Sequence, residues 1–303
     1  MSGLPPFVLH RPASVEEASR LLTEHAGEAV PYAGGTELLL LMKAGLARPR
    51  RLIDVKRIPN LAAIVVEDGE LAIGAVTRHR DVERSAAVRA AYPLVADVAR
   101  HVANVRVRSV GTVGGNLAFA DPHSDLATLF LLFDARVRLQ AGAAIRELPL
   151  ADFVVGPYET TRGDDEILTT VCLRPWPSGA TGAYLKFGVH ERPTLGVGVA
   201  IVPDAAGRIQ DARVAVGCVG PRPERLGAVE SAIRGLTAGE VERRAADLGA
   251  LAAEPVRPVD DLHGSAEYKR AMTRVFVGRA LALAAARAQG QGPRVRYPHA
   301  VVV

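Results

Sequence analysis

Apolar residues in the first 60 positions alternate between helical and extended spacing. Ser14 and the glutamate three residues after it form a capping-box pattern, and apolar residues then recur at helical spacing over 15–22. Short apolar runs typical of strands occupy 29–33 and 51–55, and a predicted helix at 37–44 lies between them, preceded by a Gly-Gly turn. The pattern predicts a strand, a glycine turn, a helix and a second strand.

The next hundred residues predict a hairpin, two helices and two further strands. Asp68-Gly69 is a strong turn signal between two apolar runs within 61–76. The expected ranges are 81–101 and 125–133 for the helices, and 136–140 and 167–173 for the strands.

The order of the predicted elements changes after the Pro- and Gly-rich stretch 174–179, which is the best linker candidate. Three strands in succession are followed by three helices, an order typical of an α+β fold. The expected ranges are 184–189, 197–202 and 214–219 for the strands, and 223–234, 238–252 and 264–287 for the helices. We therefore expect an α+β domain over 1–175, a smaller domain over 176–290, and a loosely held tail over 291–303.

Composition supports a globular protein, with 49% hydrophobic and 23% charged residues. The formal net charge of +4 is small and no long basic run occurs, which argues against nucleic-acid binding. Two distant cysteines, Cys172 and Cys218, cannot supply the four thiolates of an iron–sulfur cluster or a Cys₄ zinc site. The longest apolar run, 38–42, is too short for a membrane span, and residues 1–14 lack a signal-peptide pattern. A cytoplasmic location is expected.

Two Gly-Gly turns precede predicted helices. They are Ala33-Gly34-Gly35-Thr36-Glu37 and Gly111-Thr112-Val113-Gly114-Gly115-Asn116. Paired glycines let backbone N–H groups converge on one point, which suits phosphate, so two such loops can hold a diphosphate from opposite sides. A tight turn without a ligand is the alternative for either loop alone. Neither loop is G-x-G-x-x-G or a P-loop, and Gly196-Val197-Gly198 lacks a third glycine, so a classical dinucleotide fold is not expected.

Further motifs accompany these turns in a fixed order. They are D-P-H-S-D-L at 121–126, E-I-L at 166–168, Y-L-K at 184–186 and G-S-A-E-Y-K-R at 264–270. Together with P-Y-A-G-G-T-E-L at 31–38 and R-S-V-G-T-V-G-G-N at 108–116, they resemble the flavin-binding subunit or domain of molybdenum hydroxylases. That family includes the medium subunit of aerobic carbon monoxide dehydrogenase and the flavin domain of xanthine dehydrogenase. The resemblance covers nearly the whole chain.

The resemblance implies a two-lobed FAD-binding domain of the p-cresol methylhydroxylase and vanillyl-alcohol oxidase type over 1–175. It also implies a C-terminal domain of the CO dehydrogenase flavoprotein type, with a small antiparallel sheet and a helical bundle. The first loop would hold the diphosphate of non-covalent FAD, and the second would close over the diphosphate and ribityl chain. The implied cofactor-binding residues are Tyr32, Ala33, Gly34, Gly35, Thr36, Glu37, Leu38, Thr112, Val113, Gly114, Gly115, Asn116, Asp125, Leu168 and Lys186.

Two of these residues have specific expected roles. Asp125 would accept hydrogen bonds from flavin hydroxyls, and Lys186 near the pyrimidine end of the ring would stabilise negative charge on the reduced flavin. The simpler alternatives are a helix cap for Asp125 and a surface charge for Lys186.

Some positions depart from the family pattern. Glu37 replaces a usual Asp or Ser, Phe119 replaces a small or polar residue, and His190-Glu191-Arg192-Pro193 is an unusual run after Lys186. His79 and His123 raise the alternative of a covalent flavin link, although the molybdenum hydroxylase branch does not use one. A metal site at His123 would need ligands that we cannot identify, so no metal ligand and no catalytic side chain is predicted.

By resemblance, the chain is an FAD-binding electron-transfer subunit. It would take electrons from [2Fe–2S] clusters of an iron–sulfur subunit, after substrate oxidation by a molybdopterin subunit, and pass them to NAD, quinone or O₂. The expected assembly is a heterotrimer that dimerises. A stand-alone FAD-dependent oxidase or dehydrogenase acting on a small organic substrate is the alternative. A binding module that retains the fold without catalysis is a third possibility.

Overall fold

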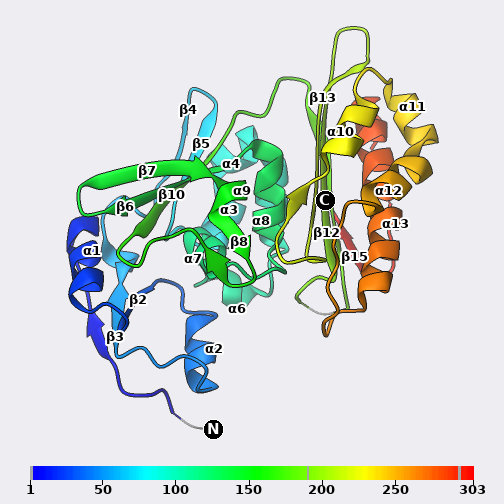
Figure 1. Ribbon diagram of the computed structural model, residues 1–303. Coiled ribbons are helices and arrows are strands. Elements are labelled where there is room, and N and C mark those ends of the chain that lie inside the picture. Colours follow the sequence, from blue (N-terminus) through cyan, green and yellow to red (C-terminus); the bar gives the residue numbers. More distant parts are fainter. Residues whose placement is uncertain (1–2, 190, 293–294) are drawn as a thin grey trace.

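The computed structural model describes residues 3–189, 191–292 and 295–303. Within these residues the chain forms three sheets of three or five strands and one two-stranded ribbon, with helices packed around them (Figure 1). Helices and strands are mixed in the first half, whereas an antiparallel sheet and then helices make up the second half. The predicted α+β organisation is confirmed. No helix in the described ranges combines the length and the apolar character that a membrane crossing requires.

A parallel three-stranded sheet forms the first lobe, with strand order β1-β3-β2. The predicted strand, glycine turn, helix and strand are confirmed as β2, the first loop, α2 and β3. The predicted cap is also present, because Ser14 Oγ accepts a hydrogen bond from the Glu17 N–H at 3.1 Å. The elements are β1 Val8–His10, α1 Val15–Glu24, β2 Ala29–Tyr32, α2 Leu38–Lys43, β3 Arg51–Asp54 and the 3₁₀ turn Val55–Arg57.

The second lobe is an antiparallel five-stranded sheet in the order β4-β5-β10-β6-β7. Its strands are β4 Ile64–Glu67, β5 Glu70–Gly74, β6 Arg136–Ala141, β7 Ala144–Pro149 and β10 Ile167–Leu173. Its helices are α3 His79–Arg84, α4 Ala86–Ala91, α5 Pro93–Arg100, α6 Val105–Arg108, α7 Val113–Phe119, α8 Asp125–Phe130, the 3₁₀ turn Leu131–Phe133 and α9 Leu150–Phe153. The ribbon pairs β8 Val154–Gly156 with β9 Glu159–Thr160. The predicted hairpin over 61–76 is confirmed as β4 and β5.

The single long helix expected over 81–101 is wrong, because the chain forms α3, α4 and α5 there. Ser85 ends the first of these and caps the second, with its Oγ accepting from the Val88 N–H at 3.3 Å. Pro93 has no N–H to continue a helix and therefore starts the third. The helix expected over 238–252 is likewise divided, at Arg244.

The C-terminal sheet is antiparallel, in the order β14-β13-β12-β11-β15. Its strands are β11 Thr181–Phe187, β12 Leu195–Pro203, β13 Ile209–Gly217, β14 Glu224–Arg225 and β15 Ala300–Val302. The helices that follow are α10 Gly227–Ile233, α11 Ala238–Arg243, α12 Ala245–Ala253 and α13 Ala266–Ala288. β15 belongs to the segment expected to be loosely held, yet it pairs with β11 because the edge strand offers free backbone groups.

Helices cover both faces of the C-terminal sheet (Figure 1). α13 packs against β11 and β12 on one face, and α8 of the second lobe packs against β12 and β13 on the other. Gly198 and Gly217 permit this close approach, because a Cβ at either position would collide with Leu132 or Thr128. Gly196, the other glycine of the pair in β12, has the Tyr184 hydroxyl where a Cβ would lie, so both glycines of that pair serve packing, in agreement with the expectation that they form no dinucleotide motif.

Two helices of the C-terminal layer touch through their backbones. A Cβ on Gly249 of α12 would overlap the carbonyl oxygen of Arg274, and one on Gly278 of α13 would lie 2.7 Å from the carbonyl oxygen of Ala245. Glycine is unfavourable in helices, so its presence at both positions reflects the short separation between the helices.

We expect Gly249→Ala to lower the free energy of unfolding by about 1–3 kcal/mol, since the methyl group forces the two helices apart. Helix propensity alone predicts the opposite sign, a gain of up to about 1 kcal/mol. Gly239→Ala in α11 is the control, because its Cβ would meet only the Arg243 guanidinium at 3.5 Å. Urea unfolding of both variants measures the effect, and a stabilised Gly249→Ala would contradict the packing argument.

Candidate functional site

The two glycine loops lie against each other. The first loop is residues 33–37, between β2 and α2, and the second is residues 111–116, which lead into α7. A Cβ on Gly34 would overlap the carbonyl oxygen of Val110 and lie 2.8 Å from the Cα of Gly111. The backbones can approach this closely only because no side chain intervenes. The structure thus brings together two motifs whose nearest ends, Glu37 and Gly111, are 74 positions apart in the sequence.

The first loop has unused backbone donors. Among the hydrogen bonds of the described residues, none uses the N–H of Gly34, Gly35 or Thr36, and all three residues are half-buried. Gly35 has φ +71°, the left-handed conformation that turns successive N–H groups toward one point. A Cβ there would lie 2.6 Å from Cε2 of Tyr32. The first loop therefore has the geometry and the free donors of an anion site.

The second loop is built differently, because its donors are used within the protein. The N–H groups of Val113 and Gly114 bond to the carbonyls of Thr77 and Ala75 at 2.9 and 2.8 Å. The N–H groups of Gly115 and Asn116 bond to Thr112, at 3.1 Å to its Oγ1 and 2.9 Å to its carbonyl. The second loop is thus a fixed wall of small residues, with Gly115 exposed, whose N–H groups from Val113 to Asn116 are already used.

Two buried polar atoms lie beneath this wall without a partner in the described part of the chain. They are the Thr77 hydroxyl and Nδ1 of His79. Burial, with a smaller contribution from the Arg108 charge, lowers the pKa of His79 to about 4. The ring is therefore neutral at pH 7 and packs close to Gly111. Sequence analysis did not single out Thr77, because an isolated threonine after a strand carries no signal of its own.

Asp125 and Lys186 form a buried ion pair. Lys186 Nζ donates to Asp125 Oδ2 at 2.6 Å and to the carbonyl of His101 at 3.1 Å. The Tyr184 hydroxyl donates to Asp125 Oδ1 at 3.1 Å. Burial raises the pKa of Asp125, while Lys186 and Tyr184 oppose this by stabilising the carboxylate. Lys186 is only 9% exposed, so the alternative of a surface charge is wrong.

Ser124 connects this pair to the second loop. As the N-cap of α8, it accepts the Ala127 N–H through Oγ at 3.2 Å and donates the hydroxyl proton to Asn116 Oδ1 at 2.6 Å. Capping is therefore done by Ser124, and Asp125 is the first helical residue. Tyr184 belongs to the Y-L-K motif at 184–186, but its contact with Asp125 could not be predicted from the sequence and is seen only in the structure.

A short segment between β11 and β12 contacts the first loop and the residues on either side of the second loop. Residues 191–194, here called the strap, follow β11. Arg192 forms ion pairs with Glu37 at 2.9 Å and with Asp121 at 3.1 Å. Glu191 accepts from Asn104 Nδ2 at 2.9 Å. Two of the departures from the family pattern, Glu37 and Arg192, thus contact each other.

His123 adds further contacts between the second lobe and the C-terminal half of the chain. Its Nδ1 lies 2.7 Å from the carbonyl of Pro193, and its Nε2 lies 3.0 Å from Asp261 Oδ2. Lys269, which is 1% exposed and belongs to the motif at 264–270, donates to the same Asp261 oxygen at 2.6 Å. Within the described ranges no group of His, Cys, Asp and Glu has the arrangement of a metal site. His123 is thus engaged in the contact between the two halves of the chain.

The remaining predicted residues lie around the loops. Leu168 is buried in β10, next to Thr169, whose carbonyl accepts the Ala75 N–H at 2.9 Å beneath the second loop. Phe119, at the end of α7, packs edge-on against the exposed Tyr158 with ring centroids 5.2 Å apart. Tyr158 carries no signal in the sequence. His190 lies outside the described residues.

Two family models match the chain. Residues 5–176 match the FAD binding domain in molybdopterin dehydrogenase, and residues 190–284 match the CO dehydrogenase flavoprotein C-terminal domain. The chain is 34% identical to the carbon monoxide dehydrogenase medium chain of Hydrogenophaga pseudoflava, over 93% of this chain and 98% of that protein. It is 32% identical to the 6-hydroxypseudooxynicotine dehydrogenase complex subunit alpha of Paenarthrobacter nicotinovorans, over 91% and 93%.

Solved structures agree with these matches. A chain of carbon monoxide dehydrogenase from Hydrogenophaga pseudoflava superposes with a TM-score of 0.88 at 33% identity, covering 94% of this chain and 99% of that one. A chain of quinoline 2-oxidoreductase from Pseudomonas putida 86 gives 0.88 at 27% identity, covering 96% and 100%. The chain therefore belongs to the family that carries the FAD binding domain of molybdopterin dehydrogenases.

Proposed function

We propose that this chain is the FAD-binding electron-transfer subunit of a molybdenum hydroxylase-type oxidoreductase. It takes electrons from the [2Fe–2S] clusters of a partner subunit and passes them to NAD, quinone or O₂. The observation that carries the proposal is the first glycine loop, whose N–H groups at Gly34, Gly35 and Thr36 have no acceptor within the described residues. Such unpaired donors beside a wall of glycines suit a diphosphate.

The residues divide the work of binding FAD. Residues 32–38 hold the diphosphate through backbone N–H groups, and residues 112–116 form the opposite wall. Asp125 and Leu168 lie on the elements that support this wall, and Lys186 holds the Asp125 carboxylate in place. When bound, FAD supplies a ring that accepts and releases electrons, and the protein binds and tunes it. Residues 1–175 form the FAD-binding domain in this proposal, and residues 176–290 form the C-terminal domain.

Partner subunits complete the proposed enzyme. Cys172 and Cys218 are both buried, and two thiols cannot hold a four-thiolate cluster. An iron–sulfur subunit and a molybdopterin subunit therefore form the heterotrimer with this chain, and the trimer dimerises. Relatives named as medium chains or as a subunit of a dehydrogenase complex support an enzyme of several subunits and do not favour a stand-alone flavoenzyme.

The chain purified alone is expected to show flavin absorbance, and acid precipitation is expected to release the flavin as FAD. Gly35→Ala should raise the Kd for FAD at least about tenfold, because a Cβ strains the left-handed backbone and meets the Tyr32 ring. Gly142→Ala is the matched control, since Gly142 also has positive φ and a Cβ there meets nothing within 4 Å.

Gly35→Ala and Gly142→Ala should each lower the free energy of unfolding by about 1–2 kcal/mol, because alanine is strained at positive φ. Titration with FAD, monitored by fluorescence quenching, gives the Kd of each variant. A Kd raised in Gly35→Ala but not in Gly142→Ala reflects FAD binding and not the loss of stability that both variants share. Equal FAD affinity in wild type, Gly35→Ala and Gly142→Ala would rule out the first loop as the diphosphate site. A chain that binds no FAD would overturn the proposed function itself.

Lys186→Met is expected to lower the free energy of unfolding by about 3–5 kcal/mol, because it leaves the Asp125 carboxylate buried without a cation. The double variant Asp125→Asn/Lys186→Met removes both charges and should recover most of that loss. Chemical unfolding of the single and double variants measures the coupling. If the reduction potential of the flavin falls equally in Lys186→Met and in the double variant, the lysine charge acts directly on the flavin and not only through Asp125.

Arg192→Ala is expected to raise the FAD dissociation rate about two- to fivefold, since the strap loses its ion pairs with Glu37 and Asp121. Salt should bring the wild-type rate closer to that of the variant, because it screens exposed pairs. Arg20→Ala, which breaks an exposed ion pair with Glu24 on α1, is the control. Identical dissociation rates for wild type and Arg192→Ala at low salt would exclude a role of the strap in retaining FAD.

A further inference from the structure

Lys56 lies beside the first glycine loop, although 23 positions separate it from Ala33. Strands β2 and β3 are neighbouring and parallel, with Tyr32 opposite Asp54 at their carboxyl ends (Figure 1). The loop after β2 and the 3₁₀ turn Val55–Arg57 after β3 therefore leave the sheet at the same edge. In open α/β sheets, ligands bind beyond this edge.

The Lys56 ammonium contacts the first loop at two points. Nζ donates to the Ala33 carbonyl at 3.2 Å and lies 3.6 Å from the centre of the Tyr32 ring, in a cation–π contact. The same ring lies against Gly35, since a Cβ on that residue would be 2.6 Å from Cε2 of the ring. Asp54 holds the ammonium in place through an ion pair of 2.8 Å, and its side chain is only 8% exposed. A cation in a fixed position thus joins the ring and the backbone of the loop.

The contact with the Ala33 carbonyl determines where the Gly34 N–H points. The two groups belong to one trans peptide, in which the carbonyl oxygen and the N–H point in opposite directions. Lys56 holds the oxygen, so the N–H is directed away from Lys56, and this N–H is one of the unused donors of the loop. Glycine offers little resistance to rotation of the peptide, because it has no Cβ. The ammonium therefore fixes an orientation that the glycine leaves free, and by polarising the peptide it makes the N–H a stronger donor.

We propose that Lys56 is a positioning residue for FAD, an inference that rests on the proposed function. It acts through the Ala33 carbonyl and the Tyr32 ring to keep the Gly34 N–H directed at the diphosphate. The loop offers partial charges from its backbone, so the orientation of each peptide decides how well the N–H groups converge on the anion. No motif marks this lysine in the sequence D-V-K-R at 54–57. Its place beside the loop follows from the parallel register of β2 and β3.

Lys56→Met tests the proposal in FAD titrations of the full chain, monitored by fluorescence quenching. The Kd for FAD should rise about five- to tenfold, because the Ala33 peptide loses the charged donor that orients it. Lys56→Arg should restore most of the affinity, since a guanidinium also donates to carbonyls and stacks on aromatic rings. Arg57→Met is the matched control. Arg57 is the next residue of the same turn, is exposed, and has no hydrogen bond or ion pair with any residue that the structure describes.

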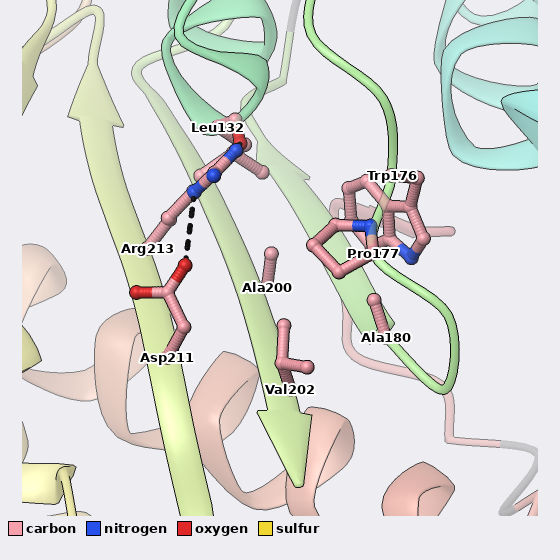
Figure 2. A pocket seen from close by; sticks show the side chains of 8 residues that line it. All are labelled: Leu132, Trp176, Pro177, Ala180, Ala200, Val202, Asp211 and Arg213. Atoms are coloured by element: carbon pink, nitrogen blue, oxygen red, sulfur yellow. Dashed lines mark hydrogen bonds and ion pairs between the residues drawn. The ribbon is translucent and has the colours of Figure 1, made fainter. Parts of the chain in front are cut away.

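Two further variants separate this role from an effect on stability alone. Lys56→Met leaves the Asp54 carboxylate without its cation, whereas Asp54→Asn/Lys56→Met removes both charges and keeps an oxygen to cap the 3₁₀ turn. The double variant should regain the urea midpoint lost in Lys56→Met but keep its weak FAD binding. Arg213 on β13 resembles Lys56, because it donates to the Leu132 carbonyl at 2.8 Å and pairs with Asp211 at 3.5 Å (Figure 2). Arg213→Met should lower the urea midpoint without changing the Kd for FAD.

The outcomes distinguish this proposal from the proposed function. Weak FAD binding in Lys56→Met and in the double variant, with near-normal binding in the other three variants, supports the positioning role. Wild-type affinity in Lys56→Met overturns it, as does a Lys56→Arg chain that binds no more tightly than Lys56→Met. Recovery of affinity in the double variant also overturns it, since Lys56 then acts only by neutralising Asp54. An equal loss in Arg57→Met contradicts it by assigning the effect to general positive charge. A wild-type chain that binds no FAD overturns the proposed function instead.

Discussion

The ion pair between Asp125 and Lys186 is the interaction on which the arrangement of the chain depends. Asp125 begins α8, and Lys186 lies on β11, so the pair joins the second lobe to the C-terminal sheet. Both charges are almost completely buried, and either one alone would be costly there. The Tyr184 hydroxyl and the His101 carbonyl supply the further hydrogen bonds that such a pair needs. The two halves of the chain therefore have one preferred alignment.

That alignment also determines the candidate FAD site. The second glycine loop is fixed from below by the carbonyls of Ala75 and Thr77, and from the side by Ser124 at the start of α8. The first loop then packs against it through Gly34, with its N–H groups unused. The C-terminal sheet contributes the strap, which reaches Glu37 and Asp121 through Arg192. All three parts of the chain thus meet at one place, although the unused N–H groups belong to the first lobe.

Local signals in the sequence were sufficient for most of the elements. The Ser14 cap, the Asp68-Gly69 turn and the apolar runs of the C-terminal strands act over a few residues, and the structure has all of them, although β13 begins five residues before its expected range of 214–219. The long helix over 81–101 failed for a local reason too, since Ser85 and Pro93 are both start signals that interrupt an apolar pattern. The strand Ala300–Val302 has no such signal, because it depends on the free edge of β11.

The sequence by itself determined the fold class, the two glycine loops and the family resemblance, because each rests on short motifs and on spacing. Tertiary structure decided how those motifs work. It gave the two loops different roles: the N–H groups of the first loop stay unused, whereas two of those in the second loop bond to the carbonyls of Ala75 and Thr77 beneath it. It paired Lys186 with Asp125, and Arg192 with Glu37, across 61 and 155 positions of the chain. Such contacts depend on the packing of sheets and helices that are distant in sequence, and no local pattern records them.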